Sequence, residues 1–184
     1  MSVYWLGISL LGTALAMFGS GDMQVSPRTT PEKGFTVVGI SARTSNAKEA
    51  SGEGVIGKQW SRFMKEGLLR KIPYKVDPNI VVVYSDYESD VNGAYDYTIG
   101  ARVNSAGKIP AGMVAKKVPS GKYTVFTSEK GFIGKVVPEA WSRIWSMPKT
   151  VMGGDRAYQA DFEIYDQRAT DPANAQVDIY VGIK

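Results

Sequence analysis

The sequence predicts an α+β domain in which two strand-helix-strand-strand halves, related by a pseudo-two-fold axis, form antiparallel sheets around a central cleft. Three observations lead to this fold. The chain of 184 residues is 43% hydrophobic, which is enough to bury a core. One helical pattern of apolar residues occurs twice, and runs of β-branched and aromatic residues flank each copy. Because two halves side by side leave a concave seam, we expect a ligand pocket there.

The two helices are the clearest repeat in the chain. Each carries apolar residues at the spacing i, i+4, i+7, i+8, which marks one face of an amphipathic helix. The strings that contain the repeat, GKQWSRFM and PEAWSRIW, share Trp-Ser-Arg at the same offset. The matched residues, each 81 positions apart, are Ile56 and Val137, Trp60 and Trp141, Phe63 and Ile144, and Met64 and Trp145.

Strand-like runs precede and follow each predicted helix. Adjacent runs joined by short turns, notably at residues 85–95, favour antiparallel hairpins over the alternative of a doubly wound parallel sheet. In the first half the runs cover residues 35–40, 80–84 and 95–100; in the second half they cover 123–127, 161–165 and 177–182, and a further strand is expected at 113–118.

The first 34 residues divide into an apolar segment and a linker. Residues 3–18 carry no charge and are fewer than the roughly 20 apolar residues that a membrane-spanning helix needs. The small-x-small sequence at 14–16 suits signal peptidase. We therefore predict a signal peptide or membrane tether at 1–24, a linker at 25–34 and the folded domain at 35–184. Export or tethering in a bacterium is the expectation. Because residues 1–2 supply no basic flank, a packed or disordered cytoplasmic extension stays open.

Composition excludes several classes of function. The chain has no Cys and no His, so it cannot form disulfides, a Cys/His zinc site or an imidazole-based catalytic triad. The net charge is only +4, and the densest basic stretch, residues 65–71, includes Glu66. We therefore expect no direct nucleic-acid binding. The acidic string SDYESD lacks the spacing of an EF-hand, and we predict neither a metal nor a cofactor.

Glu163 breaks the repeat, because its partner 81 positions earlier is Val82. Side chains alternate along a strand, so Phe162 and Ile164 share the face opposite to Glu163. If those two residues pack against the helices, Glu163 points into the seam. A carboxylate in an apolar cleft has a raised pKa or awaits a cation. The alternative is a solvated carboxylate on an edge strand. Asp161, nearer the strand end, is expected to tolerate exchange for Asn.

Aromatic residues supply the rest of the predicted site. Aromatic faces hold flat or cationic ligands by stacking and cation–π contact. Packing in the core is the alternative for each of them. The candidate ligand-binding residues are Glu163, Tyr84 and its repeat partner Tyr165, Tyr97 on the neighbouring strand, the helical residues Trp141 and Trp145, and Met113 as an adaptable contact.

Several blocks of the sequence, in order and spacing, resemble the GyrI-like small-molecule-binding domain, also described as the bacterial transcription activator effector-binding domain. These blocks cover residues 35–184 and include FTVVGISARTSN, VVVYSDYESDVNGAYDYTIGARV, IPAGMVAKKVPSGKY, ADFEIYD and VDIYVGIK. The resemblance implies a duplicated strand-helix-strand-strand fold whose central cleft binds amphipathic, often cationic, aromatic compounds. It also implies a cleft carboxylate at the position of Glu163.

The predicted function is that of a stand-alone protein that captures such a compound. In multidomain relatives the module is the ligand sensor of a DNA-binding regulator, and 34 preceding residues are too few for a DNA-binding domain. A sensing subunit that joins a separate DNA-binding regulator is therefore one alternative. The other is a hydrolase for strained electrophiles, in which Glu163 acts on water and Tyr84 or Tyr165 orients it. Binding is preferred to catalysis because no second catalytic group has a specific spacing.

Overall fold

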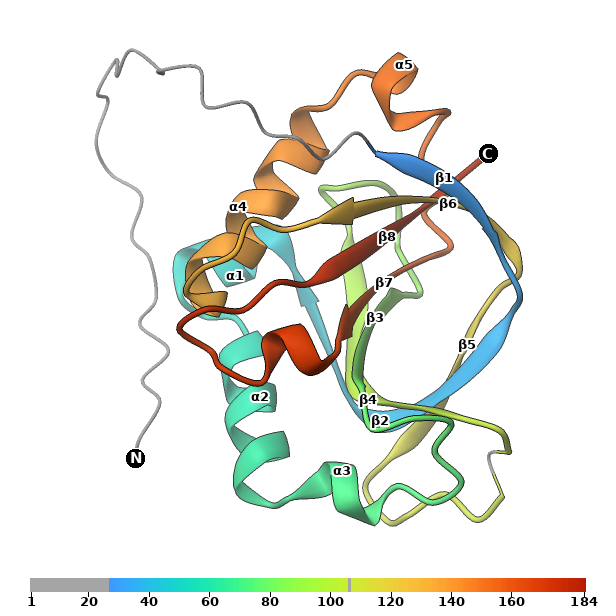
Figure 1. Cartoon of the computed structure of the whole chain (residues 1–184), viewed down its shortest axis with the longest axis vertical. Helices are drawn as coiled ribbons and strands as arrows, with labels where there is room; N and C mark the ends of the chain where they lie inside the picture. Colours follow the sequence, from blue (N-terminus) through green and yellow to red (C-terminus); the bar gives the residue numbers. More distant parts are fainter. Residues whose placement is uncertain (1–26, 106) are drawn as a thin grey trace.

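Eight antiparallel strands form one curved sheet in the order β1-β6-β8-β7-β3-β4-β2-β5 (Figure 1). The computed structural model describes residues 27–105 and 107–184. The strands are β1 Arg28–Glu32, β2 Phe35–Ser45, β3 Ile80–Ser85, β4 Ala94–Val103, β5 Val114–Val118, β6 Gly121–Thr127, β7 Ala160–Tyr165 and β8 Asp178–Ile183. The helices are α1 Asn46–Ser51, α2 Ile56–Lys65, α3 Leu68–Lys71, α4 Ile133–Ser146 and α5 Lys149–Met152, with a 3-10 turn η1 at Gln167–Ala169.

The strand order is arranged evenly about the central β3–β7 pair. Outward from that pair lie β4 and β2 on one side and β8 and β6 on the other. In the β3–β7 pair Val82 lies directly opposite Glu163, its partner in the sequence repeat. The predicted α+β class and the antiparallel pairing are confirmed. The duplication of the two halves stays a prediction.

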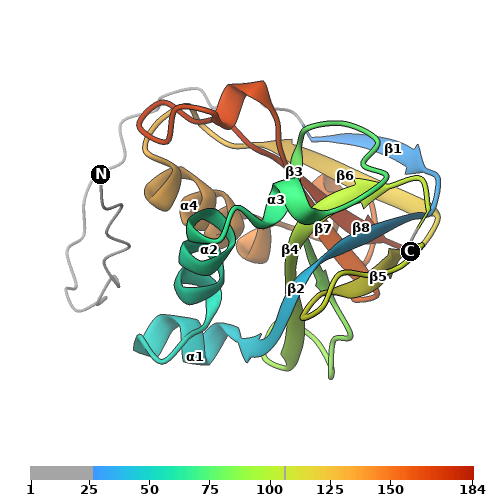
Figure 2. The same ribbon diagram turned by 90° about the horizontal axis from the view of Figure 1, so that it is seen from below.

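Helices α2 and α4 cover one face of the sheet (Figure 2). Their apolar stripes are the ones that the sequence predicts, and Phe63, Trp141 and Ile144 from these stripes are buried. The stripes extend beyond the core, however. Met64 is 63% exposed and Trp145 is 46% exposed, so the repeated position at the end of each stripe faces solvent. Burial of the remaining stripe residues holds the helices on the sheet.

The other face of the sheet buries a second aromatic cluster. Phe162 stacks on Tyr180 with ring centroids 4.3 Å apart and meets Phe35 and Tyr123 edge-on. Phe162 and Ile164 therefore pack on the face opposite to the helices, and the condition stated for Glu163 in the sequence analysis is not met. The face opposite to the helices is also buried, because the sheet curves around it (Figure 1). Alternating apolar residues could not reveal which face the helices would cover.

Close approach of β2 and β4 depends on a pair of glycines. Gly39 lies opposite Gly100 in the antiparallel ladder. A Cβ added at Gly39 would lie 2.1 Å from the carbonyl oxygen of Ile99, and one at Gly100 would lie 2.0 Å from that of Val38. No larger residue fits either position unless the backbone shifts.

The segment before the domain contributes a strand. Residues 28–32, inside the range predicted as a linker, form β1 and pair with the edge of β6. The signal peptide or tether predicted at 1–24 lies outside the described residues. Within residues 27–184, leaving out 106, no helix has the length and apolar character needed to span a bilayer. The domain boundaries and the localisation stay predictions.

Candidate functional site

Glu163 lies in the middle of β7, on the face that the helices cover, and is 0% exposed. Three side chains donate hydrogen bonds to its carboxylate. The Tyr84 hydroxyl and the Trp141 indole N–H donate to Oε1 at 2.9 and 2.5 Å, and the Tyr165 hydroxyl donates to Oε2 at 2.7 Å. These donors come from β3, α4 and β7. Two strands and one helix therefore meet at this carboxylate.

Burial sets the protonation behaviour of this cluster. Removal from water raises the pKa of Glu163, and the three hydrogen bonds oppose that rise. Burial and the nearby carboxylate of Glu163 together raise the pKa of Tyr84 and Tyr165 well above the usual value for tyrosine. Both hydroxyls therefore stay protonated near neutral pH and act as donors.

An aromatic layer surrounds the carboxylate. The ring of Tyr84 lies 5.0 Å from that of Trp141 and 5.3 Å from that of Tyr97, centroid to centroid. Tyr97 is fully buried and accepts a hydrogen bond of 2.7 Å from the indole N–H of Trp60. Trp60 in turn meets Tyr165 edge-on at 4.9 Å. The layer is continuous, because each ring contacts the next.

Five of the predicted site residues gather in this layer: Glu163, Tyr84, Tyr97, Tyr165 and Trp141. The other two lie outside it. The ring of Trp145 lies 6.3 Å from that of Trp141, centroid to centroid, and reaches solvent. Met113 is half-buried and packs against the hydrophobic core on the side of the sheet that the helices cover. The seven residues thus share one side of the sheet. Their roles in binding stay predictions.

A second buried acid was not among the predicted site residues. Asp161 is 0% exposed, accepts hydrogen bonds from the Tyr87 hydroxyl at 2.7 Å and the backbone N–H of Gly182 at 2.9 Å, and forms an ion pair with Arg156. This burial and the ion pair with Arg156 count against the expectation that Asp161 tolerates exchange for Asn. The sequence does hold a signal for it, because the residue 81 positions earlier is Ile80.

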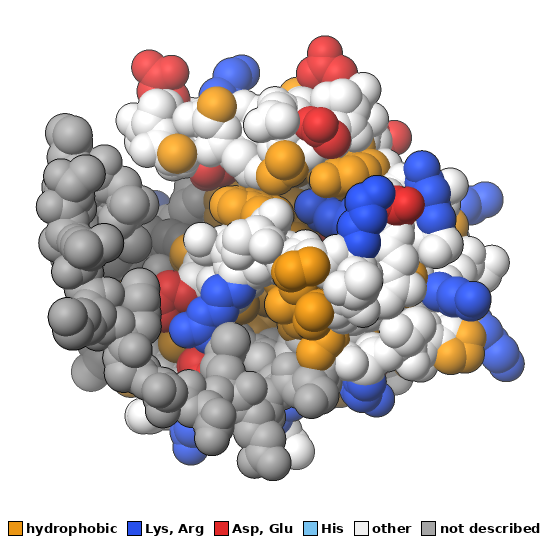
Figure 3. Space-filling model, turned by 90° about the horizontal axis from the view of Figure 1, so that it is seen from above, with side chains coloured by type: hydrophobic (Ala, Val, Ile, Leu, Met, Phe, Trp, Pro, Cys, Tyr) orange, Lys and Arg blue, Asp and Glu red, His pale blue; other side chains and the backbone are white. Residues whose placement is uncertain are grey.

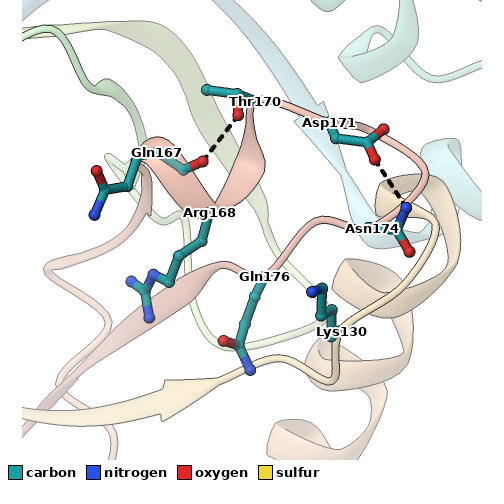
Figure 4. Close-up of a pocket in the computed structure, with 7 residues that line it drawn as sticks. All are labelled: Lys130, Gln167, Arg168, Thr170, Asp171, Asn174 and Gln176. Carbon is teal, nitrogen blue, oxygen red and sulfur yellow. Dashed lines mark hydrogen bonds between the residues drawn. The ribbon is translucent and has the colours of Figure 1, made fainter.

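Side chains cover Glu163 completely, and aromatic rings surround it where the sequence analysis predicts the central cleft. A surface hollow lies elsewhere, beside η1. It has a volume of about 580 Å³ and a polar lining (Figure 4), which consists of Lys130, Gln167, Arg168, Thr170, Asp171, Asn174 and Gln176. Arg168 is held there by Asp166 and Asp178. No predicted site residue lines this hollow.

Exposed apolar side chains lie on the surface near the aromatic layer, at the ends of α4 and α5. Apolar side chains reach the surface between basic ones in the view of Figure 3. Trp145 on α4 and Val151 on α5 are among the exposed apolar residues, at 46% and 49%. Among residues 27–105 and 107–184, no group of three acidic, Cys or His side chains is placed to hold a metal ion.

Comparison with known proteins finds one family and two curated relatives. Residues 30–183 match the model of the family Cass2, described as "Integron-associated effector binding protein". The chain is 37% identical over 147 residues to "Putative transcriptional regulator protein YobU" of Bacillus subtilis, covering 79% of this chain and 90% of that protein. It is 35% identical over 158 residues to "Transcriptional regulator BrlR" of Pseudomonas aeruginosa, covering 85% of this chain. The matched region spans about half, 54%, of the length of BrlR.

Solved structures share the fold. The integron cassette protein VCH_CASS2 from the mobile metagenome of Vibrio cholerae is 28% identical with a TM-score of 0.67, covering 86% of this chain and 96% of that one. SAV2435, whose structure was solved bound to tetraphenylphosphonium, is 20% identical with a TM-score of 0.70, covering 87% of this chain and 94% of that one.

Proposed function

Because the chain belongs to the Cass2 family of integron-associated effector-binding proteins, which are GyrI-like, we propose that it binds an amphipathic, cationic aromatic molecule beside Glu163. The family match confirms the resemblance seen in the sequence. Small-molecule binding is the function of such a domain. The charge of the ligand and the part played by Glu163 are the proposal.

The observation that carries the proposal is a buried carboxylate with no cationic partner. All three donors to Glu163 are neutral, and it forms an ion pair with none of the Lys and Arg residues that the structure describes. Burial of a charge is costly unless an opposite charge accompanies it. An organic cation would supply that charge and would also contact the faces of Tyr84, Trp141 and Trp60.

Entry of a ligand requires the rings to move. Trp141 lies directly against Glu163 on α4, and Trp145 reaches solvent one turn further along the same helix. Rotation of these two indoles would open a path from the surface to the carboxylate. The resulting pocket would be lined by aromatic side chains, whose flat faces suit ligands of different outline.

Binding has more support than hydrolysis. A hydrolase would need Glu163 to contact a water molecule. The donors around Glu163 are all aromatic side chains, and the family that the chain matches is described by effector binding. A role as the sensing part of a regulator is favoured by one observation, namely that two relatives are named as transcriptional regulators. Co-purification of a DNA-binding protein with the tagged full chain tests that role.

Titration calorimetry with tetraphenylphosphonium, the cation named with SAV2435, tests the proposed binding. We expect the wild type to bind it and to reject tetraphenylborate, an anion of similar shape. Glu163→Gln keeps the size of the side chain but removes its charge, so the affinity should fall by about ten- to a hundredfold. Glu139→Gln removes an exposed charge from α4 and serves as the matched control. Equal affinity for the two ions, or equal losses in the two variants, contradicts the proposal.

A further inference from the structure

Asp161 holds a cation that belongs to the chain itself. Its carboxylate is fully buried and pairs with the guanidinium of Arg156, whose side chain is only 11% exposed. The hydroxyl of Tyr87 and the backbone N–H of Gly182 also donate to Asp161. This acid therefore differs from Glu163, two residues along the same strand face, in having a charged partner.

Arg156 sits among aromatic rings as an organic cation would. Its guanidinium carbon lies 4.4 Å from the ring centroid of Tyr158 and 6.0 Å from that of Trp141. These are the distances at which a cation is attracted to an aromatic face. Its Nε atom is buried and has no hydrogen-bond partner within the described part of the chain. Arg156 thus fills the space between these rings and Asp161, although one of its N–H donors makes no hydrogen bond there.

Strained backbone holds the rings at this position. Tyr158 has a φ of 50°, a left-handed conformation that is costly for a bulky residue. Asp86, directly before Tyr87, has a φ of 51°. Among the described residues the only other non-glycine residue with positive φ is Tyr74. Two of these three positions therefore orient Tyr87 and Tyr158, whose ring centroids lie 5.6 Å apart.

The Asp161 cluster and the Glu163 cluster are joined. Trp141 donates its indole N–H to Glu163 and turns its ring toward Arg156. A second connection runs through the rings, because Tyr87 lies 5.8 Å from Tyr95 and Tyr95 lies 5.5 Å from Tyr84. Two residues along a strand place the two acids about 7 Å apart on one face. One rigid molecule with two charges could therefore reach both.

We propose that Asp161, Tyr87, Tyr158 and Trp141 form a second cation subsite, and that Arg156 is its resident cation and restricts the protein to singly charged ligands. The inference rests on the proposed function, because the ligand's first charge lies at Glu163. Arg156 is thereby a residue that determines specificity. Its removal would expose a second carboxylate to the ligand.

The test compares two rigid biaryl ligands that differ by one charge. Methyl viologen carries two positive charges, and 1-methyl-4-phenylpyridinium carries one. Wild-type protein should bind the monocation more tightly. In Arg156→Gln the affinity for methyl viologen should rise by about tenfold or more relative to the monocation, because a carboxylate contact has been gained. The matched control is Arg156→Gln with Asp161→Asn, which leaves no buried charge at the subsite and should lose that gain.

Each outcome separates the two proposals. Tighter binding of methyl viologen by the wild type overturns the role of Arg156 and needs no variant. An unchanged ratio of affinities in Arg156→Gln, or the same gain in the double variant, also overturns it, while intact monocation binding leaves the proposed function standing. Failure of both cations to bind to any of these proteins contradicts both proposals. Thermal unfolding of each variant shows whether it has folded.

Discussion

Strands β3 and β7 lie side by side at the centre of the sheet and occupy equivalent places in the repeat, yet they carry opposite chemistry on the face below the helices. On β3 this face presents Ile80, Val82 and Tyr84, whereas on β7 it presents Asp161, Glu163 and Tyr165. Two aliphatic residues are thus matched by two buried acids. Strand β3 thus contributes aliphatic packing and the Tyr84 hydroxyl, whereas β7 contributes both buried acids, and we propose that a cation binds at one of them, Glu163.

The largest effect that separates the two acids should appear in stability. Asp161→Asn leaves the guanidinium of Arg156 buried without its partner charge. Removal of one partner from a buried ion pair costs about 3 to 5 kcal/mol, so the free energy of unfolding should fall by that amount. Urea denaturation measures it. Glu163→Gln breaks no ion pair and should lower the free energy of unfolding much less. Similar losses in the two variants would show that the ion pair with Arg156 does not set Asp161 apart from Glu163.

Making β7 resemble β3 should have the next largest effect. In Glu163→Val the donors Tyr84, Trp141 and Tyr165 all lose their acceptor. Unsatisfied buried donors cost about 1 to 3 kcal/mol each, although ring movement can recover part of this. We expect a loss of at least about 2 kcal/mol in urea denaturation and no binding of tetraphenylphosphonium. A Glu163→Val protein as stable as the wild type would show that the three hydrogen bonds contribute little.

A smaller effect than these losses of stability is expected in the pH dependence of cation binding, which we attribute to Glu163. Burial raises its pKa in the folded protein, so the folded state binds this proton more tightly than the unfolded state. The associated stability is present below the unfolded pKa and is lost as the pH rises through the folded pKa. Affinity for a cation changes in the opposite sense and should fall as acid protonates the carboxylate. Calorimetry at several pH values measures this fall, which Glu163→Gln should lack.

The smallest effect should come from single donors. Tyr84→Phe removes one of the three hydrogen bonds to Glu163 and leaves the ring in place. The expected loss of stability is about 1 kcal/mol. Because one interaction that favours the ionised form is gone, the pKa of Glu163 should rise further. The fall in cation affinity should then begin at a higher pH than in the wild type, and an unchanged pH profile would argue against this hydrogen bond.

The sequence predicted the parts of the fold that depend on periodicity. Helices α2 and α4 and the strands next to them follow from residue spacing, which records burial directly. Strand β1 did not follow, because RTTPE has few strand-forming residues and is held by its pairing with β6. The sequence also did not predict which face of β7 the helices cover. Residues on both faces of this strand are buried, because the sheet curves around the face that the helices leave free.

The site was predictable where the repeat is asymmetric. Glu163 stood out because Val82 is its partner, and the same comparison of Asp161 with Ile80 would have found the second acid. Arg156 and Tyr158 gave no such signal. Their position depends on the segment between α5 and β7 and on the left-handed backbone of Tyr158, neither of which follows from spacing along the chain.

The most direct test of cation binding at Glu163 is the NMR signal of the Trp141 indole N–H, which donates to that carboxylate. Addition of tetraphenylphosphonium to protein labelled with nitrogen-15 should shift this signal more than those of Trp60 and Trp145. The shift should be lost or greatly reduced in Glu163→Gln. A Trp141 signal that stays in place while the cation binds, with shifts confined to the exposed Trp145, would contradict binding beside Glu163.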